Sequence, residues 1–158
     1  TCFVAGTPVH TLDGLRPIEA IQVGDQVLSQ DEATGALSFQ PVVFLHHNPP
    51  GKTLRVTLAS GESLVCSVYH RFWRAGHGWA MARELKPGDT LRAFGGLVRV
   101  AGVATDSVQP LYNLDVAGSR TFFVGTSTVL VHDNTLPDHR LEPFDAVPVV
   151  DSESPNQQ

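Results

Sequence analysis

Five side chains suited to acyl-transfer chemistry lie in three stretches, at the start, the middle and the end of the chain. Cys2 stands in the turn-rich opening TCFVAGTPVHTLDG, Ser67 precedes His70 by three residues in SVYHRFW, and VLVHDNT carries His132 and Asn134. A thiol can attack a carbonyl carbon when a nearby imidazole moves the proton, whereas a cysteine without such neighbours is usually a small buried hydrophobe. The chemistry therefore requires a fold that brings the three stretches together.

Length and charge limit the class of protein. The 158 residues are enough for one domain with a core, alone or followed by a tail. A net charge of −5 argues against nucleic acid or an anionic membrane as a partner, and no apolar stretch approaches the roughly 20 residues of a membrane helix. The opening residues lack the basic end and apolar core of a secretory signal. We expect a monomer with no nucleic-acid or membrane partner.

Metal and cofactor binding are not expected either. Two cysteines, Cys2 and Cys66, are too few for a disulfide scaffold or a four-thiolate zinc site. His46 and His47 are adjacent, and adjacent side chains on a strand point to opposite faces.

Apolar and β-branched runs separated by Gly, Pro, Asn and Asp predict an all-β fold. The expected strands are 41–45, 53–58, 97–103, 112–116, 121–124 and 129–131. Helical periodicity is limited to single turns near 17–21 and 80–85, which are too short to be stable without tertiary support.

Two segments repeat the same pattern at an offset of 64 residues. IQVGDQVL at 21–28 and LKPGDTLR at 85–92 both place Gly-Asp between apolar residues, which is typical of a turn that leads into a core strand. Either the two copies mark two related β subdomains or the short turn recurs by chance.

The composition changes after Asn134. Residues 135–158 contain four prolines, five acidic residues and one arginine, a composition that buries too little apolar surface to offset the entropy of ordering. We expect a domain at 1–134 and a linker or tail at 135–158. The alternative is a final docked strand at 146–150, which Pro148 disfavours.

Three longer segments, taken in order, resemble the Hint family, the self-processing module shared by inteins, bacterial intein-like domains, pretoxin Hint domains and hedgehog autoprocessing domains. CFVAGTPVHTLDGLRPIEAIQVGDQVLS is similar to the family's N-terminal block, GWAMARELKPGDTL to the stretch after its TxxH motif, and LYNLDVAGSRTFFVGTSTVLVHDN to its C-terminal blocks. The resemblance covers nearly all of residues 1–134. It implies a β fold of two pseudo-two-fold related subdomains with the termini close together, inside a larger secreted or surface bacterial protein.

The resemblance implies that Cys2 attacks the carbonyl carbon of Thr1 and exchanges the amide for a thioester. This step is uphill unless the fold strains the amide and the departing amine is protonated. His70 is the expected proton donor. Ser67, where the family motif has threonine, is expected to orient either the junction amide or the imidazole.

At the other junction, the resemblance implies that Asn134 cyclises and releases the chain that begins at Thr135. His132 is the expected proton donor, but Asp133 separates it from the asparagine, where the family usually places the two residues side by side. If the strand continues, alternation puts His132 and Asn134 on one face. Asp133 either modulates His132 or itself takes the position of the terminal asparagine. We expect cleavage to dominate over ligation.

Two further residues are possible modulators. Arg120 stands where the C-terminal block often has histidine, and arginine cannot act as a base at ordinary pH. Cys66 is either a packed core residue or the partner of Cys2 in a reversible disulfide.

Two functions of other classes remain open. One is an N-terminal-nucleophile amidohydrolase, which would need long amphipathic helices that the sequence does not predict. The other is a non-catalytic β interaction module, which would leave the placement of Cys2, His70 and Asn134 unexplained. Under self-processing, the partners are the flanking segments of the same precursor.

Overall fold

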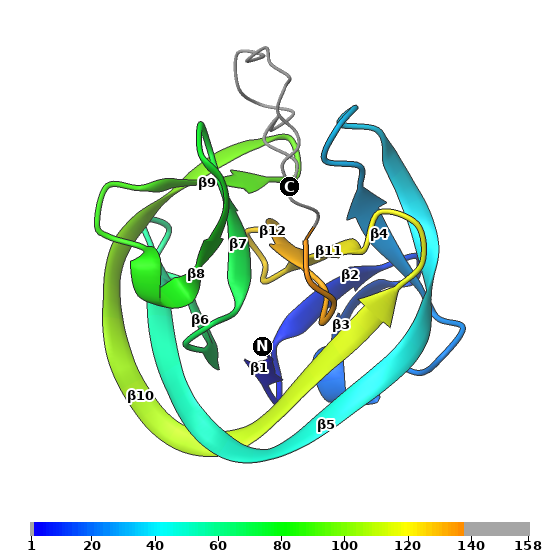
Figure 1. Ribbon diagram of the computed structural model, residues 1–158, viewed down its shortest axis with the longest axis horizontal. Coiled ribbons are helices and arrows are strands. Elements are labelled where there is room, and N and C mark those ends of the chain that lie inside the picture. Colours follow the sequence, from blue (N-terminus) through cyan, green and yellow to red (C-terminus); the bar gives the residue numbers. More distant parts are fainter. Residues whose placement is uncertain (1, 138–158) are drawn as a thin grey trace.

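A computed structural model describes residues 2–137 of the chain (Figure 1). The described residues form twelve strands and two short 3-10 turns. The strands are β1 (Phe3–Val4), β2 (Pro8–Thr11), β3 (Gly14–Pro17), β4 (Gln26–Gln30), β5 (Leu37–Leu58), β6 (Ser63–Ser67), β7 (Arg71–Arg74), β8 (Gly78–Met81), β9 (Thr90–Ala93), β10 (Gly96–Val116), β11 (Thr121–Val124) and β12 (Val129–His132), and the turns are η1 (Ile18–Ala20) and η2 (Ala82–Glu84). The all-β prediction is confirmed. Within residues 2–137, no helix has the length and apolar character needed to cross a membrane.

Two long strands form the frame of the molecule. β5 and β10 pair antiparallel along most of their length and curve together around the other strands in a horseshoe (Figure 1). The sequence predicted two separate strands within each of them, and that division is wrong. Register shifts between Gly51/Gln109 and Asn48/Leu111 absorb the Pro-Pro-Gly segment, because a bulge tolerates residues that cannot complete the ladder.

The repeated Gly-Asp segments adopt the same turn in two equivalent places. Gly24 and Gly88 both have φ of +95°, a conformation that glycine adopts without strain. The Asp25 carboxylate accepts from the Gln22 amide and the Asp89 carboxylate from the Lys86 amide, each at 2.9 Å. A 3-10 turn precedes each copy, and the strand that follows pairs with β5 in the first copy and with β10 in the second. The two related subdomains are therefore confirmed.

The core lies where the two subdomains meet. Every residue of β11 and β12 is buried, because these strands lie in the middle of the sheet. The ring of Phe3 packs edge-to-face against those of Phe72 and Phe122, at 6.2 and 6.4 Å between centroids. This aromatic packing joins the first strand to both halves of the molecule.

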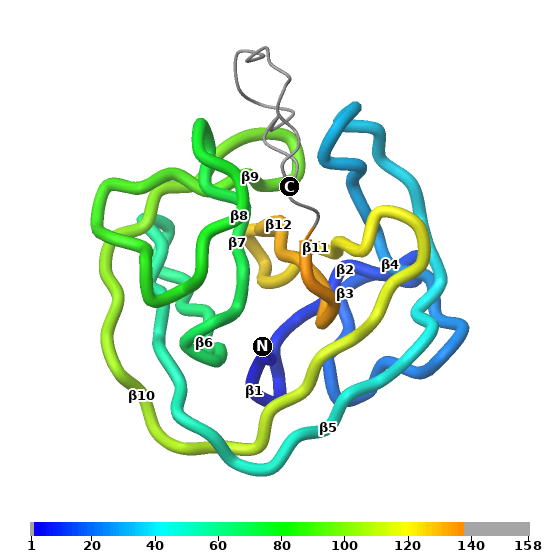
Figure 2. The backbone as a smooth tube through the Cα atoms, in the orientation of Figure 1, coloured from blue at the N-terminus to red at the C-terminus, as the bar shows by residue number. Residues whose placement is uncertain are grey.

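The start and the end of the described chain meet at β10. β1 pairs with Leu111 and Tyr112, and the Asn134 amide donates to the Leu114 carbonyl at 3.0 Å. Figure 2 shows the first strand and the last strand together in the interior of the horseshoe. Residues 138–158, which include most of the predicted tail, lie outside the described residues, as does Thr1.

Candidate active site

Cys2 is held by Ser67 through two main-chain groups. The Cys2 amide donates to Ser67 Oγ at 2.8 Å, and the Ser67 amide donates to the Cys2 carbonyl at 2.7 Å. Cys2 is fully buried, and pairing of Phe3 with Cys66 extends the contact along β1 and β6. The nitrogen that Ser67 binds is the nitrogen of the peptide bond between Thr1 and Cys2. The hydroxyl is thus positioned to orient that bond.

A tight turn places His70 close to Ser67. The His70 amide donates to the Ser67 carbonyl at 3.2 Å, and the His70 carbonyl accepts from the Ala82 amide at 2.8 Å. The spacing of three residues in SVYHRFW is therefore the span of a turn that ends β6 and leads into β7. This turn brings the His70 imidazole against β1, with its ring centroid 4.1 Å from that of Phe3.

His70 is fully enclosed among aromatic rings. Phe72 packs against it on the second side, at 5.9 Å between centroids. Burial lowers the pKa of His70 well below its ordinary value, while hydrogen bonding of the imidazole to the main-chain carbonyl of His132 acts in the opposite direction. His70 is therefore a neutral imidazole at neutral pH, and it lies beside His132, although the two residues are 62 positions apart in the sequence.

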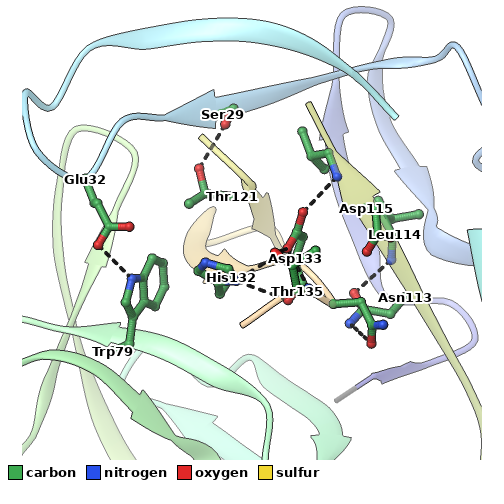
Figure 3. A network of polar contacts seen from close by, with 12 residues as sticks. Ser29, Glu32, Trp79, Asn113, Leu114, Asp115, Thr121, His132, Asp133 and Thr135 are labelled. Carbon is green, nitrogen blue, oxygen red and sulfur yellow. Dashed lines mark hydrogen bonds and ion pairs between the residues drawn. The ribbon is translucent and has the colours of Figure 1, made fainter. Parts of the chain in front are cut away.

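His132 is directed toward Asp133 at the end of β12 (Figure 3). Its Nδ1 lies 3.2 Å from the Asp133 main-chain oxygen and 3.4 Å from Asp133 Oδ1. Trp79 packs edge-on against the imidazole at 4.9 Å between centroids, and its indole nitrogen donates to Glu32 at 3.0 Å. The orientation of His132 is thus fixed by Asp133 and by Trp79, which Glu32 holds in place.

Asp133 is buried and accepts several hydrogen bonds. Its Oδ2 accepts from the Val116 amide at 2.9 Å, and its Oδ1 accepts from the Thr135 amide at 2.8 Å and the Thr135 hydroxyl at 2.5 Å (Figure 3). β12 ends at His132, so the regular alternation that would place His132 and Asn134 on one face does not continue to Asn134. The inserted acid instead fixes the chain against β10.

Asn134 contacts a residue that the sequence did not single out. Asn113 Nδ2 on β10 donates to Asn134 Oδ1 at 3.3 Å. Because Phe3 pairs with Tyr112 and the strands are antiparallel, the preceding residue, Cys2, lies opposite Asn113. Both predicted junctions therefore lie next to the same part of β10. Asn113 carries no motif by itself, so the sequence gives no reason to select it.

Asn48 is a second contact that sequence reasoning missed. Its Nδ2 donates to Cys2 Sγ at 2.8 Å. Asn48 lies on β5, directly before the Pro49-Pro50 segment where the register shifts. The sequence contains no signal for this contact, because it depends on the curvature of two paired strands.

Cys66 and Arg120 occupy places distinct from the junctions. Cys66 and Cys2 are both free thiols, and Cys66 packs in the main core, where burial raises its pKa. Cys66 is paired with Phe3, whereas Cys2 is bonded to Ser67, so alternation turns the two thiols to opposite faces. Arg120 is exposed at φ of +61° in the turn before β11, and its carbonyl accepts from the Asp133 amide.

The two adjacent histidines on β5 have separate partners. His46 Nε2 lies 3.1 Å from Asp115 Oδ1, and His47 stacks on Tyr112 at 4.5 Å between centroids. Among residues 2–137, no group of three or more His, Cys, Asp or Glu side chains is arranged to hold a metal ion.

Comparisons with known proteins show that other chains share this fold. The bacterial intein-like domain from Clostridium thermocellum is 30% identical, with a TM-score of 0.80 over 84% of this chain and 99% of that domain. The gp41-1 intein is 27% identical, with a TM-score of 0.72 over 84% of this chain and 98% of the intein. A DnaB intein from Synechocystis, 14% identical, shares the fold, with a TM-score of 0.76 over 85% of this chain and 99% of that one.

No curated protein sequence matches the chain. Residues 8–134 match the family model described as the pretoxin Hint domain. Similarity to intein-like domains supports self-processing, by cleavage or by splicing, as the general class of activity. The chain belongs to the pretoxin Hint family.

Proposed function

We propose that this domain cuts its own polypeptide at the bond between Thr1 and Cys2 and at the bond between Asn134 and Thr135. The observation that carries the proposal is the hydrogen bond from the Cys2 amide to Ser67 Oγ, since it fixes the nitrogen of the first bond beside the nucleophile. The domain is residues 1–134, and its partners are the flanking segments of the same chain. It acts once per molecule, as a monomer and without a cofactor.

In the N-terminal step, the Cys2 sulfur forms a bond to the Thr1 carbonyl carbon and the bond from that carbon to the Cys2 nitrogen breaks. The thiol loses a proton and the new amine gains one. His70 supports this exchange because a neutral imidazole holds a proton on one nitrogen and can accept one on the other. Ser67 keeps the nitrogen in place while the amide is converted to the thioester. Water then attacks the thioester carbon, the bond from that carbon to sulfur breaks, and the N-terminal flank leaves as a carboxylic acid while Cys2 regains its thiol.

In the C-terminal step, the Asn134 side-chain nitrogen attacks the Asn134 main-chain carbonyl carbon, closes a succinimide and releases the amine of Thr135. Support comes from Asn113, which holds the Asn134 side-chain oxygen, and from the bond of the Asn134 amide to Leu114. His132 is the proton source for the departing amine.

A second candidate bond follows Asp133. The Asp133 main-chain oxygen is the carbonyl that His132 Nδ1 contacts, at 3.2 Å, and a donor at that oxygen stabilises charge that develops during attack. The Asp133 carboxylate would then attack its own carbonyl carbon, form a cyclic anhydride and release the amine of Asn134. The released chain would begin at Asn134 instead of Thr135.

Cleavage dominates over ligation in this proposal. Ligation requires the Thr135 hydroxyl to approach the thioester carbonyl to about 3–3.5 Å. That hydroxyl is bonded to Asp133 in a local turn and would have to leave it. The Asp133 carboxylate that accepts this hydrogen bond could also act as a base for the Thr135 hydroxyl. Ligation is therefore the competing outcome to measure.

The test is intact-mass analysis of a precursor with a reporter domain on each side. We expect hydroxylamine or an added thiol to accelerate cleavage before Cys2, because both intercept a thioester, and Cys2→Ala to abolish that cleavage. Cleavage that persists in Cys2→Ala would refute the thioester. The mass of the C-terminal fragment identifies the bond that breaks, and Asn134→Ala and Asp133→Ala should each block only their own bond. A major product joining both reporters would refute the predicted outcome, and an uncut precursor would leave the interaction-module alternative.

A further inference from the structure

We infer that Asn48 is a further catalytic residue, whose side-chain amide orients the Cys2 sulfur and stabilises its thiolate. The inference rests on the proposed function, since it assigns a role in forming the thioester. The contact is direct: Asn48 Nδ2 donates to Cys2 Sγ at 2.8 Å. A nitrogen donor that faces a sulfur favours the charged form of that sulfur over the neutral thiol.

The backbone around Asn48 directs its side chain to the sulfur. Between Asn48 and Gly51, β5 advances three residues while β10 advances only two, from Leu111 to Gln109. This extra residue is a bulge at Pro49-Pro50, and bulges commonly re-aim a side chain beside a functional site. Asn48 pairs with Leu111, the same residue that pairs with Val4 of β1, so β10 connects the donor to the strand that carries Cys2.

Every polar atom of Cys2 therefore has a defined partner from β5 or β6. Ser67 binds the amide and the carbonyl, and Asn48 binds the sulfur. A thiol that turns freely about its side-chain bond loses most of its attack geometry, and small misplacements of reacting atoms are costly in rate. Asn48 and Ser67 together fix the sulfur relative to the amide that it attacks.

The ionisable side chains on the neighbouring strands have other partners. His46 pairs with Asp115, His47 stacks on Tyr112, and Cys66 lies in the core. His70 is enclosed between Phe3 and Phe72. The amide of Asn48 is thus the group that the described structure supplies to the sulfur.

The experiment titrates the Cys2 thiolate by its ultraviolet absorbance in a Cys66→Ala chain, because this readout needs no reagent to enter a buried site. Asn48→Ala is expected to raise the Cys2 pKa by about one unit, equivalent to roughly a tenfold smaller thiolate fraction at neutral pH. Asn48→Asp keeps the shape but replaces the donor with a carboxylate, so it should raise the pKa further. His47→Gln, one residue away with its ring on Tyr112, is the matched control and should leave the pKa unchanged.

The second readout is hydroxylamine-induced cleavage before Cys2 in the flanked precursor. Asn48→Ala should slow it about tenfold at neutral pH, and Asn48→Asp should be slower still. An unchanged pKa in both variants, a shift of equal size in His47→Gln, or faster cleavage in Asn48→Asp would overturn the inference. If the parent does not cleave with hydroxylamine, the proposed function fails, while the titration still decides whether Asn48 stabilises the thiolate. Near-ultraviolet circular dichroism identifies a variant that does not fold, and Asn48→Leu, which removes the donor at nearly the same side-chain size, then replaces it with the same expected results.

Discussion

Burial of His70 predicts a specific dependence of stability on pH. Its pKa is well below the ordinary value in the folded chain because the imidazole is enclosed, and it returns to about 6.5 on unfolding. Below pH 6.5 the unfolded chain binds a proton at this site and the folded chain does not. Folding stability from this site is therefore fully present above that pH and is lost as the pH falls toward the folded pKa.

The magnitude follows from the linkage of one proton. Each pH unit below 6.5 costs at most about 1.4 kcal/mol until the folded pKa is reached, so lowering the pH from 7.5 to 5.5 should cost up to about 1.4 kcal/mol at this site. His70→Phe removes the titration and keeps an aromatic ring between Phe3 and Phe72. The variant should therefore lose less free energy of unfolding than its parent over the same interval, by up to about 1.4 kcal/mol.

The assay is urea unfolding at both pH values in a Cys2→Ala background, which keeps the chain intact. His77→Gln removes one exposed histidine and serves as the matched control. The reasoning about His70 is refuted if His70→Phe and its parent lose the same free energy of unfolding between pH 7.5 and 5.5.

Three more predictions concern the turn, the C-terminal acid and the second thiol. Gly88→Ala should lower the free energy of unfolding in urea by about 1–2 kcal/mol, because alanine is strained at a φ of +95°. A Cβ would meet open space at Gly88 and also at Gly102, so Gly102→Ala is the matched control and should cost much less. Asp133→Ala should cost about 1–3 kcal/mol by leaving the buried Val116 amide unpaired, whereas Asp133→Asn keeps an acceptor and should cost less; equal losses would contradict this account. A phosphine reductant should change the rate of cleavage before Cys2 equally in the parent and in Cys66→Ala, because Cys2 and Cys66 are both free thiols. A reductant that accelerates cleavage in the parent but not in Cys66→Ala would support a Cys2–Cys66 disulfide.

The sequence predicted local structure well, because local chemistry determines it. The 3-10 turns at Ile18–Ala20 and Ala82–Glu84 lie within the predicted single turns, and the repeated Gly-Asp turns form as expected. The predicted runs 121–124 and 129–131 coincide with β11 and most of β12. Apolar alternation and glycine placement act over a few residues, so they can be read directly.

Features that depend on the curvature and register of distant strands could not be predicted. The continuity of β5 and β10 through Pro49-Pro50 and Pro110 requires a partner strand that tolerates bulges, and no local pattern reveals that partner. Asn48 contacts Cys2 and Asn113 contacts Asn134 only because the folded chain brings together segments that are far apart in the sequence. The direction of His132 toward Asp133 depends on where β12 ends, and strand ends are poorly specified by sequence.

The central position of the final strand has a consequence for when the chemistry can begin. Phe3 pairs with Tyr112, and β12 fills the middle of the sheet against β7, β9 and β11. Such distant pairings make folding slow, and they cannot form before the ribosome has released residue 132. A nascent chain therefore carries its thiol in an unassembled site throughout translation of the domain. Under the proposed function, scission before Cys2 would therefore wait until synthesis has passed Asn134, and the precursor would keep its N-terminal flank while it is being made.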